Sequence, residues 1–430
     1  MPSRRVIILG STGSIGRQTL DVIAHLNALH ERDEHEHRYD VVGLAAGANV
    51  ARLDEQSRAH PSARLAITHA DVRDLALGEQ GPRAAFTGAL LHAFHGDDAA
   101  ERLVREVECD LVVSAIVGVA GLRATLAAAE LGRDIALANK ETLVAGGCVV
   151  VPAARASGAR LLPVDSEHSG LWQCLVGACW SRGSPIAPPI ESPRGVTRMI
   201  LTASGGPFRT WTKNEIDAAT PAQALAHPTW QMGAKVTIDS ASLVNKALEL
   251  IEAHWLFGMP ADRLDAVVHP QSIVHALVEF DDGSTLAQLG LPDMRTPIQW
   301  ALTFPGRAEA PTTRLRWHEA RHLVFEPVDR TRFPAIDLAF EVMRQGPTSA
   351  NGCVLNAANE VAVQAFLAPG SMLAFGRIGT IVRRTIDELG RHEARTLDDV
   401  LRVDREARAL ALELVAHESR GKSLNRGVRA

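Results

Sequence analysis

Two carboxylates, Asp165 and Glu167, stand close together after the apolar run Leu162-Pro163-Val164. If that run is a β-strand that continues through them, both side chains leave the same face, because side-chain direction alternates along a strand. Carboxylates held that close repel each other unless a cation lies between them or one of them is protonated. The pair therefore indicates either a site for Mg²⁺ or Mn²⁺, which prefer oxygen ligands, or an ordinary solvated strand end.

Three polar residues converge on a predicted helix that spans residues 242–257. Asn245 and Glu249 are separated by one helical turn and share a face, and Lys246 lies beside them. Ser242 is the predicted N-cap of this helix. An amide, an ammonium and a carboxylate within one turn could bind a phosphate and a metal. A surface ion pair between Lys246 and Glu249 is the simpler alternative.

Two loops carry further polar groups. Residues 204–208 (SGGPF) follow a predicted strand at 199–202 and offer a hydroxyl and two glycines, as a cradle for an oxyanion requires. The same loop is compatible with an ordinary turn. Residues 227–233 (HPTWQMG) place a His, a Trp and a Met between Pro and Gly, which is typical of a mobile flap that covers a ligand.

A glycine-rich turn, GSTGSIG at residues 10–16, joins a predicted strand at 6–9 to a predicted helix at 14–29. Glycines let the backbone approach a phosphate, and the helix N-terminus presents free N–H groups. The spacing is GxxGxxG, so a plain tight turn is the alternative to a dinucleotide site. The end of the second predicted strand, residues 44–49, has no carboxylate to repel a 2′-phosphate, and Arg52 is the nearest candidate cation.

Alternating strands and helices must position the groups of the first part of the chain. One of the helices is predicted to be capped by Asn49 and to run to Ala59. This order predicts a Rossmann-like α/β unit, whose parallel sheet is covered on both faces. The predicted strands are residues 6–9, 41–45, 65–68, 111–114, 135–138 and 161–164.

The second part of the chain predicts two further architectures. A strand at 199–202 and strands at 274–280 and 285–289, joined by a turn at 281–283, indicate an α+β region with an antiparallel hairpin. The Pro-rich segment 184–193 is interpreted as a surface loop. Helical periods at 335–345, 357–366, 378–389 and 397–417 predict a C-terminal helical bundle.

Composition restricts the class of protein. A chain of 430 residues needs more than one domain. The net charge of -5 and the scattered His residues argue against a nucleic-acid surface. Five Cys without a C-x-x-C motif indicate free thiols in a reducing compartment. The longest apolar region, 111–122, is too short for a membrane span and the first apolar run is too short for a signal peptide, so we expect a cytoplasmic protein without membrane contact.

Nine stretches of the chain together resemble the 1-deoxy-D-xylulose 5-phosphate reductoisomerase family. They include VDSEHS at 164–169, HPTWQMG at 227–233, DSASLVNKALELIEA at 239–253 and NAANEVAVQAF at 356–366. The stretches occur in the family's order over nearly the whole chain. Members of this family act second in the non-mevalonate pathway to isoprenoids.

The resemblance implies a division of the chain and a set of cofactors. It implies an NADPH-binding domain at 1–164, a catalytic, metal-binding and dimerisation domain at 165–305, a linker at 306–332 and a C-terminal helical domain at 333–430. It further implies a homodimer, NADPH, and Mg²⁺ or Mn²⁺, with Co²⁺ as another possible metal. The implied metal ligands are Asp165, Glu167 and Glu249.

The resemblance also assigns the other site residues by position. Catalytic roles fall to Lys140, Glu167 and His227, while the base for the C4 hydroxyl is open among Glu167, Lys140 and a metal-bound water. Many relatives carry a Lys where this chain has Ala48, which leaves its preference for NADPH over NADH open. The residues that match substrate contacts are Lys140, Ser166, Glu167, Ser204, His227, Ser240, Asn245, Lys246 and Glu249. The residues assigned to the cofactor are Thr12, Gly13, Ser14, Ile15, Gly47, Ala48, Asn49, Asn139, Glu141, Gly233 and Met294.

The implied reaction breaks the C3–C4 bond of a sugar phosphate in a retro-aldol step and joins C2 to C4. NADPH then reduces the resulting aldehyde to 2-C-methyl-D-erythritol 4-phosphate. Two other functions fit parts of the pattern. One is a metal-dependent sugar-phosphate isomerase or aldolase without nicotinamide chemistry. The other is an inactive dinucleotide sensor, which ought to lack the metal carboxylates or the phosphate residues, whereas this chain has both.

Overall fold

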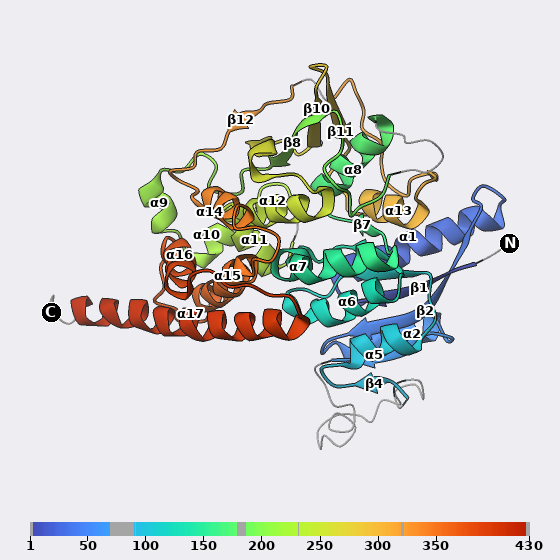
Figure 1. The fold of residues 1–430 in the computed structure, drawn as a ribbon, viewed down its shortest axis with the longest axis horizontal. Coiled ribbons are helices and arrows are strands. Elements are labelled where there is room, and N and C mark those ends of the chain that lie inside the picture. Colours follow the sequence, from blue (N-terminus) through green and yellow to red (C-terminus); the bar gives the residue numbers. More distant parts are fainter. Residues whose placement is uncertain are drawn as a thin grey trace. The chain divides into compact units, whose positions relative to one another are not determined.

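The computed structural model describes residues 3–68, 90, 92–178, 186–230, 232–319 and 322–426, with side chains as far as residue 418. These residues form two compact units, and Figure 1 labels their helices and strands. Unit 1 comprises Met1–Thr142, Val150–Ile190 and Asp293–Arg314, and unit 2 comprises Leu143–Val149, Glu191–Pro292 and Leu315–Ala430. The division into three domains and a linker remains a prediction.

Unit 1 is built around a sheet of seven strands in the order β4-β3-β2-β1-β5-β6-β7, and every neighbouring pair is parallel. Its strands are β1 (Ser3–Leu9), β2 (Arg38–Ala46), β3 (Arg64–Ile67), β4 (Phe94–His95), β5 (Leu111–Ser114), β6 (Asp134–Leu137) and β7 (Leu161–Pro163). Its helices are α1 (Ser14–Glu31), α2 (Val50–Ala59), α5 (Ala99–Glu106), η1 (Val119–Gly121), α6 (Leu122–Glu130), α8 (Ser166–Ala178) and α13 (Arg295–Thr303), while α7 (Lys140–Ser157) has residues in both units.

The burial of β1 explains why the sequence predicts this sheet correctly. Val6, Ile7, Ile8 and Leu9 are all fully buried. Because successive side chains of a strand point to opposite faces, both faces of the sheet are covered at β1. A continuous apolar run is therefore needed in this central strand. The predicted Rossmann-like parallel sheet is confirmed.

Unit 2 contains a mixed sheet of five strands in the order β11-β10-β8-β9-β12. The hairpin of β10 and β11 is antiparallel, with Gly283 at φ +84° in its turn, as predicted. The strands are β8 (Val196–Ala203), β9 (Leu264–Val268), β10 (Val274–Phe280), β11 (Thr285–Leu289) and β12 (Glu326–Pro327). Helices around this sheet are α9 (Lys213–Asp217), α10 (Pro221–Leu225), α11 (Ala234–Ala241), α12 (Val244–Phe257) and η2 (Ala261–Arg263).

The predicted C-terminal helices are present in unit 2. They are α14 (Ala335–Met343), α15 (Asn351–Leu367), α16 (Arg377–Leu389) and α17 (Leu397–Arg426). The last of them is the long red helix in Figure 1 and continues past the predicted end at residue 417. Helix α15 packs against α11, α14, α16 and α17 and is buried along most of its length. It is therefore the central helix of this region.

The Pro-rich segment is more tightly packed than the predicted surface loop in its described part, residues 186–193. The N–H of Leu161 in edge strand β7 donates to the Pro188 carbonyl (2.7 Å), and Trp172 Nε1 donates to the Ile186 carbonyl (2.7 Å). Pro188 itself is buried. The segment therefore covers an edge of the sheet that would otherwise be open. Residues 184 and 185 lie outside the described residues.

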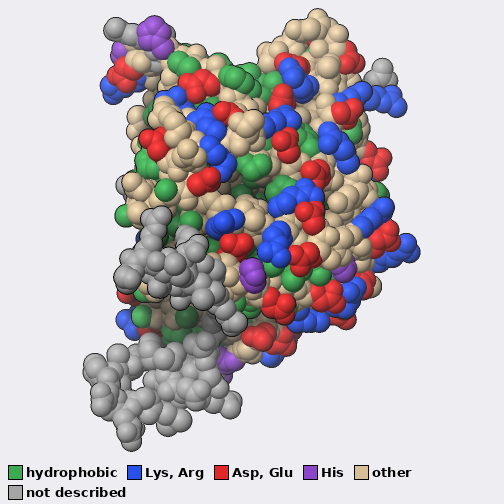
Figure 2. All heavy atoms as spheres, turned by 90° about the vertical axis from the view of Figure 1, so that its left-hand side faces the viewer, with side chains coloured by type: hydrophobic (Ala, Val, Ile, Leu, Met, Phe, Trp, Pro, Cys, Tyr) green, Lys and Arg blue, Asp and Glu red, His purple; other side chains and the backbone are tan. Residues whose placement is uncertain are grey.

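The surface carries charges of both signs. On the face drawn in Figure 2, Lys and Arg side chains are interspersed with Asp and Glu side chains. This mixture agrees with a chain that has 45 Lys and Arg and 50 Asp and Glu. In the part of the chain that the structure describes, every helix is too short or too polar to cross a membrane.

Candidate active site

Glycines shape the turn between β1 and α1 in unit 1. Gly10 has φ +79°, and a Cβ there would lie 2.5 Å from the carbonyl oxygen of Ala115, so only glycine fits. Gly13 precedes α1 and has no side chain that could cap the N–H groups of its first turn. Thr12 and Ile15, on either side, are partly exposed. The turn therefore offers backbone N–H groups and a helix N-terminus to a phosphate.

The end of β2 has the local structure that the sequence predicts. Asn49 Oδ1 accepts the backbone N–H of Arg52 (3.2 Å) and caps α2. Ala48 is exposed and Gly47 is half-buried. Residues 47–49 carry no charge that would oppose a 2′-phosphate, and the Arg52 side chain begins one turn into the helix.

Asn139 and Glu141 stand at the start of α7. Asn139 is buried, its Nδ2 donates to the Gly118 carbonyl (2.9 Å), and its Oδ1 accepts a backbone N–H of the first turn of α7 (3.3 Å). Its amide therefore fixes the beginning of the helix. Glu141 is buried in the same turn. The remaining predicted cofactor residues also lie at helix starts: Ser14 is the first residue of α1, Met294 precedes α13 and Gly233 precedes α11.

The acidic motif lies where β7 ends and α8 begins, not on a strand as predicted. Strand β7 ends at Pro163, and the N–H of Ser169 donates to the Asp165 carbonyl (2.8 Å), as at the start of a helix. Asp165 and Glu167 therefore do not share a strand face, and that premise is wrong. The physical reason is local, because acidic residues such as Glu167 favour the first turn of a helix.

Asp165 is paired within unit 1. Its Oδ2 lies 2.6 Å from Lys140 Nζ, and its Oδ1 lies 3.5 Å from Nδ1 of the buried His168. Burial alone would raise the pKa of Asp165, but the charge of Lys140 and the contact with His168 hold that pKa well below its usual range. The Ser166 hydroxyl donates to Glu167 Oε2 (2.5 Å). His168 was missed from the sequence, although a His close behind an Asp at a helix start is a usable signal.

In unit 2 a histidine joins two serines that are distant in the sequence. His227 Nε2 lies 3.1 Å from the hydroxyl oxygens of both Ser204 and Ser240. Its Nδ1 accepts the backbone N–H groups of Thr229 (3.1 Å) and Trp230 (2.9 Å). A ring nitrogen that accepts carries no proton, so the neutral ring has its proton on Nε2, toward the serines. Burial lowers the pKa of His227 and thereby favours this neutral form.

The turn after β8 brings Ser204 to Ser240. Gly205 and Gly206 have φ +85° and +63°, values that other residues rarely adopt. A Cβ on Gly206 would lie 2.6 Å from the carbonyl oxygen of Ser240, so the turn packs directly on the end of α11. The Gly206 N–H donates to the Ser204 hydroxyl (3.2 Å). Both glycines are therefore required by the local geometry.

The junction of α11 and α12 differs from the predicted single helix at 242–257. Leu243 has φ +56° between the two helices, and α12 begins at Val244. Ser242 belongs to the end of α11, where its hydroxyl donates to the Ile238 carbonyl (3.2 Å). The prediction of Ser242 as N-cap is wrong because another helix, α11, occupies the preceding residues and Leu243 precedes α12.

On α12 the predicted convergence of three polar groups is confirmed. Asn245 Nδ2 and Lys246 Nζ each donate to one oxygen of the Glu249 carboxylate. Lys246 is 3% exposed and Glu249 is 1% exposed. The alternative of a surface ion pair is thereby excluded. A buried carboxylate with this much donor support is a costly arrangement to keep unless it has a function.

Known proteins match this chain over almost its full length. Family models described as 1-deoxy-D-xylulose 5-phosphate reductoisomerase match residues 6–147, and models of the family's C-terminal domains match residues 161–257 and 289–410. A relative from Rhodopirellula baltica named 1-deoxy-D-xylulose 5-phosphate reductoisomerase is 45% identical over 96% of this chain and 95% of its own. This chain belongs to the 1-deoxy-D-xylulose 5-phosphate reductoisomerase family.

Solved structures of the reductoisomerase family have the same fold. The enzyme from Zymomonas mobilis in complex with NADPH is 40% identical, with a TM-score of 0.82 over 96% of this chain and 99% of that one. A reductoisomerase in complex with NADPH, fosmidomycin and magnesium is 34% identical, with a TM-score of 0.82 over 96% of this chain and 98% of that one. Both similarities extend over the two units of this chain.

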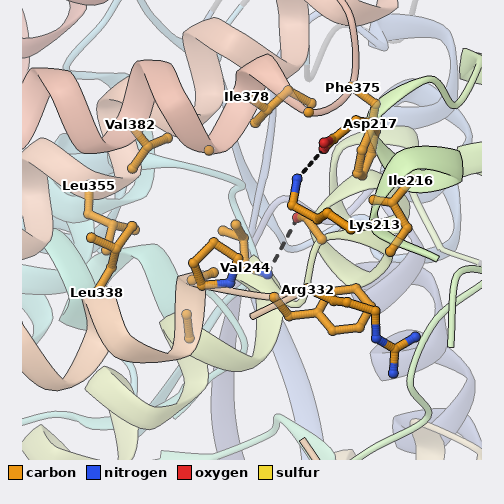
Figure 3. A pocket seen from close by; sticks show the side chains of 17 residues that line it. Lys213, Ile216, Asp217, Val244, Arg332, Leu338, Leu355, Phe375, Ile378 and Val382 are labelled. Carbon is orange, nitrogen blue, oxygen red and sulfur yellow. Dashed lines mark hydrogen bonds and ion pairs between the residues drawn. The ribbon is translucent and has the colours of Figure 1, made fainter. Parts of the chain in front are cut away.

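An apolar cavity of about 70 Å³ in unit 2 is separate from the predicted reductoisomerase site (Figure 3). The ion pair of Lys213 and Asp217 lines it on one side, and Ser242 and Val244 belong to its wall. The other side chains labelled in Figure 3 are Arg332 and the apolar Ile216, Leu338, Leu355, Phe375, Ile378 and Val382. None of its described lining residues is among the predicted substrate residues, so a phosphorylated substrate is not expected there.

Proposed function

We propose that this chain converts 1-deoxy-D-xylulose 5-phosphate to 2-C-methyl-D-erythritol 4-phosphate, with NADPH as reductant and a divalent metal. The observation that carries this proposal is the buried group of Asn245, Lys246 and Glu249 on α12. A cation suited to a phosphate and a carboxylate suited to a metal lie within one turn, as a phosphorylated, metal-chelating substrate requires. Membership of the reductoisomerase family supports the same conclusion.

The metal site that we propose uses the residues that match the family's metal ligands, Asp165, Glu167 and Glu249. The donor set fits a hard divalent ion, because it consists of carboxylate oxygens. Asp165 stays ionised through its lowered pKa, and both oxygens of Glu249 accept hydrogen bonds from α12 side chains. Mg²⁺, Mn²⁺ or Co²⁺ bound there would supply Lewis-acid polarisation of the substrate carbonyl and orient the adjacent hydroxyl.

The phosphate site that we propose consists of Ser204, Ser240, Asn245 and Lys246, with His227 above the two serines. All of these side chains are hydrogen-bond donors, and the Nε2–H of His227 points toward the serine pair. Such a set matches the acceptor oxygens of a phosphate group. Phosphate binding would hold His227 and Trp230 over the substrate, and Trp230 and Met232 would then exclude water, while residue 231 of this predicted flap lies outside the described residues.

Lys140, Ser166 and Glu167 would contact the part of the substrate that reacts. Lys140 and Ser166 would orient the substrate hydroxyls, and Lys140 is an ammonium already held in place by Asp165. The proton of the C4 hydroxyl would leave to Glu167, because Lys140 as an ammonium beside Asp165 cannot accept a proton. NADPH, bound by the glycine turn at residues 10–16 and by residues 47–49, would supply the hydride.

We also propose a homodimer and a cytoplasmic location. Strand β11 is an edge strand and carries the exposed Leu286, so it offers a surface to a second copy. The four described cysteines, Cys109, Cys148, Cys174 and Cys353, are buried free thiols, as a reducing compartment favours.

Replacement of Lys246 tests the phosphate site. We expect Lys246→Ala to raise the KM for 1-deoxy-D-xylulose 5-phosphate by about 10-fold or more, since a charge-assisted contact to a phosphate contributes roughly 1.5–3 kcal/mol. The rate with unphosphorylated 1-deoxy-D-xylulose should change much less. Lys213→Ala is the matched control, because Lys213 also pairs with a carboxylate but lies in the wall of the separate cavity. An unchanged KM would remove Lys246 from the phosphate site.

Replacement of Arg52 tests the cofactor choice. Because residues 47–49 carry no cation, we expect Arg52→Ala to lower the ratio of kcat/KM for NADPH to that for NADH by about 5-fold, the effect of one partly screened charge. Arg58→Ala, later in the same helix, should leave the ratio unchanged. An equal ratio in the unsubstituted and Arg52→Ala proteins would show that Arg52 does not bind the 2′-phosphate.

One assay separates this function from its main rival. With substrate and Mg²⁺ present, absorbance at 340 nm should fall as NADPH is oxidised. A metal-dependent isomerase or aldolase without nicotinamide chemistry would consume the substrate at constant absorbance. That second result would replace the proposed function.

A further inference from the structure

A buried hydrogen bond connects the C-terminal helices to the helix that carries Ser240. Asn359 on α15 donates from Nδ2 to Asp239 Oδ1 (2.7 Å), across 120 residues of sequence. Asn359 is 0% exposed and Asp239 is 1% exposed. The other carboxylate oxygen of Asp239 lies 3.0 Å from Lys235 Nζ, on the same helix α11. A buried carboxylate is thus held between an amide from α15 and an ammonium from its own helix.

The orientation of the Asn359 amide is fixed by charge. Its Nδ2 must face Asp239, because its Oδ1 would repel the carboxylate. Among the described residues, Oδ1 of Asn359 is buried without a hydrogen-bond partner. The side chain therefore holds Asp239 through Nδ2 and leaves its own acceptor without a partner, which costs free energy.

Asp239 is adjacent to the residue that closes the candidate phosphate site. Ser240 follows it directly, its hydroxyl lies 3.1 Å from His227 Nε2, and its carbonyl packs against Gly206. The chain then leaves α11 through Leu243, whose φ of +56° is strained for a non-glycine residue, and reaches Asn245. A shift in the position of Asp239 would therefore displace both Ser240 and Asn245.

We propose that Asn359 is a positioning residue that acts through Asp239 on Ser240 and thereby sets the affinity of the site for phosphate. This inference rests on the proposed function, because it takes the Ser204–Ser240 cluster to be a phosphate site. It gives helix α15 a role in substrate affinity that acts through α11.

The test uses Asn359→Ala, with Asn356→Ala as the matched control. Asn356 lies on the same helix and is also 0% exposed, but its Nδ2 donates to Glu360 (3.1 Å) within α15. Asn359→Ala should raise the KM for 1-deoxy-D-xylulose 5-phosphate by about 10-fold with a smaller change in kcat, as misplacement of a binding group does. The KM for NADPH should stay unchanged. Asn356→Ala should lower the melting temperature without a change in either KM.

Binding of inorganic phosphate is measured by calorimetry on the full-length protein. This measurement tests the role of Asn359 separately from the proposed function. If the unsubstituted protein binds phosphate and Asn359→Ala binds it about 10-fold more weakly, the inference holds. Equal affinity in the two proteins overturns the role of Asn359 and leaves the proposed function standing. No phosphate binding and no turnover by the unsubstituted protein would overturn the proposed function itself.

Two more variants keep the test decisive if Asn359→Ala folds poorly. Lys235→Met removes the second partner of Asp239 from a side chain that is 21% exposed, and should weaken phosphate binding in the same direction. The exchange Asp239→Asn with Asn359→Asp restores an amide–carboxylate pair and should recover affinity relative to Asn359→Asp alone. If the exchange gives no recovery and Lys235→Met has no effect, the coupling does not exist.

Discussion

Glu249→Gln is expected to lower kcat by roughly 10²- to 10³-fold, the size of effect seen when a group that stabilises developing charge is removed. The substitution keeps the shape of the side chain but removes a proposed metal ligand. It also leaves Lys246 without the anion with which it is paired in a nearly dry environment. Steady-state kinetics at saturating NADPH and Mg²⁺ measure the effect.

The controls for Glu249→Gln distinguish a lost ligand from a damaged fold. NADPH affinity should be unchanged, because the glycine turn and the end of β2 belong to unit 1. Glu413→Gln, an exposed position on α17, should have normal kinetics. A kcat for Glu249→Gln within about twofold of the unsubstituted value would be too small for a lost charge-stabilising ligand and would exclude Glu249 from the metal site.

Removal of divalent metal is expected to abolish turnover and leave the fold intact. The fold should survive because the acidic residues have cationic partners of their own, Lys140 beside Asp165 and Lys246 beside Glu249. These ion pairs offset the charge of the carboxylates when no metal is bound. After treatment with a chelator, circular dichroism should therefore remain native while NADPH oxidation stops.

Recovery of NADPH oxidation after metal is added back shows that the loss was due to the metal. Addition of Mg²⁺ or Mn²⁺ after removal of the chelator should restore the rate, since hard oxygen ligands accept either ion. Ca²⁺ is a useful comparison, because it prefers longer bonds and more ligands than three carboxylates offer. Full activity in the continued presence of chelator would contradict the metal site.

Local patterns predicted much of the fold. The strand at residues 111–114 and the hairpin strands at 274–280 and 285–289 have the predicted bounds, because apolar runs and a glycine turn determine them within a few residues. The convergence of Asn245 and Lys246 on Glu249 was equally accessible, since the spacing within one helix decides it. The prediction succeeded where neighbours in sequence are neighbours in space.

The errors arose where the chain changes element or where distant residues meet. The shared strand face of Asp165 and Glu167 is wrong because an apolar run does not reveal where the first turn of the next helix begins. Helix α11 was missed, and with it the strained Leu243 between two helices. The pairing of Asn359 with Asp239 depends on a contact across 120 residues, for which a single sequence has no local signal.

The most direct test of the proposed function follows the hydride itself. The purified protein is incubated with 1-deoxy-D-xylulose 5-phosphate, Mg²⁺ and NADPH that carries deuterium at the transferable position, and the product is analysed by mass spectrometry and NMR. We predict 2-C-methyl-D-erythritol 4-phosphate with one deuterium at the carbon of the former aldehyde, in equal amount to the NADP⁺ formed. Consumption of the sugar phosphate without transfer of deuterium would contradict the proposed function.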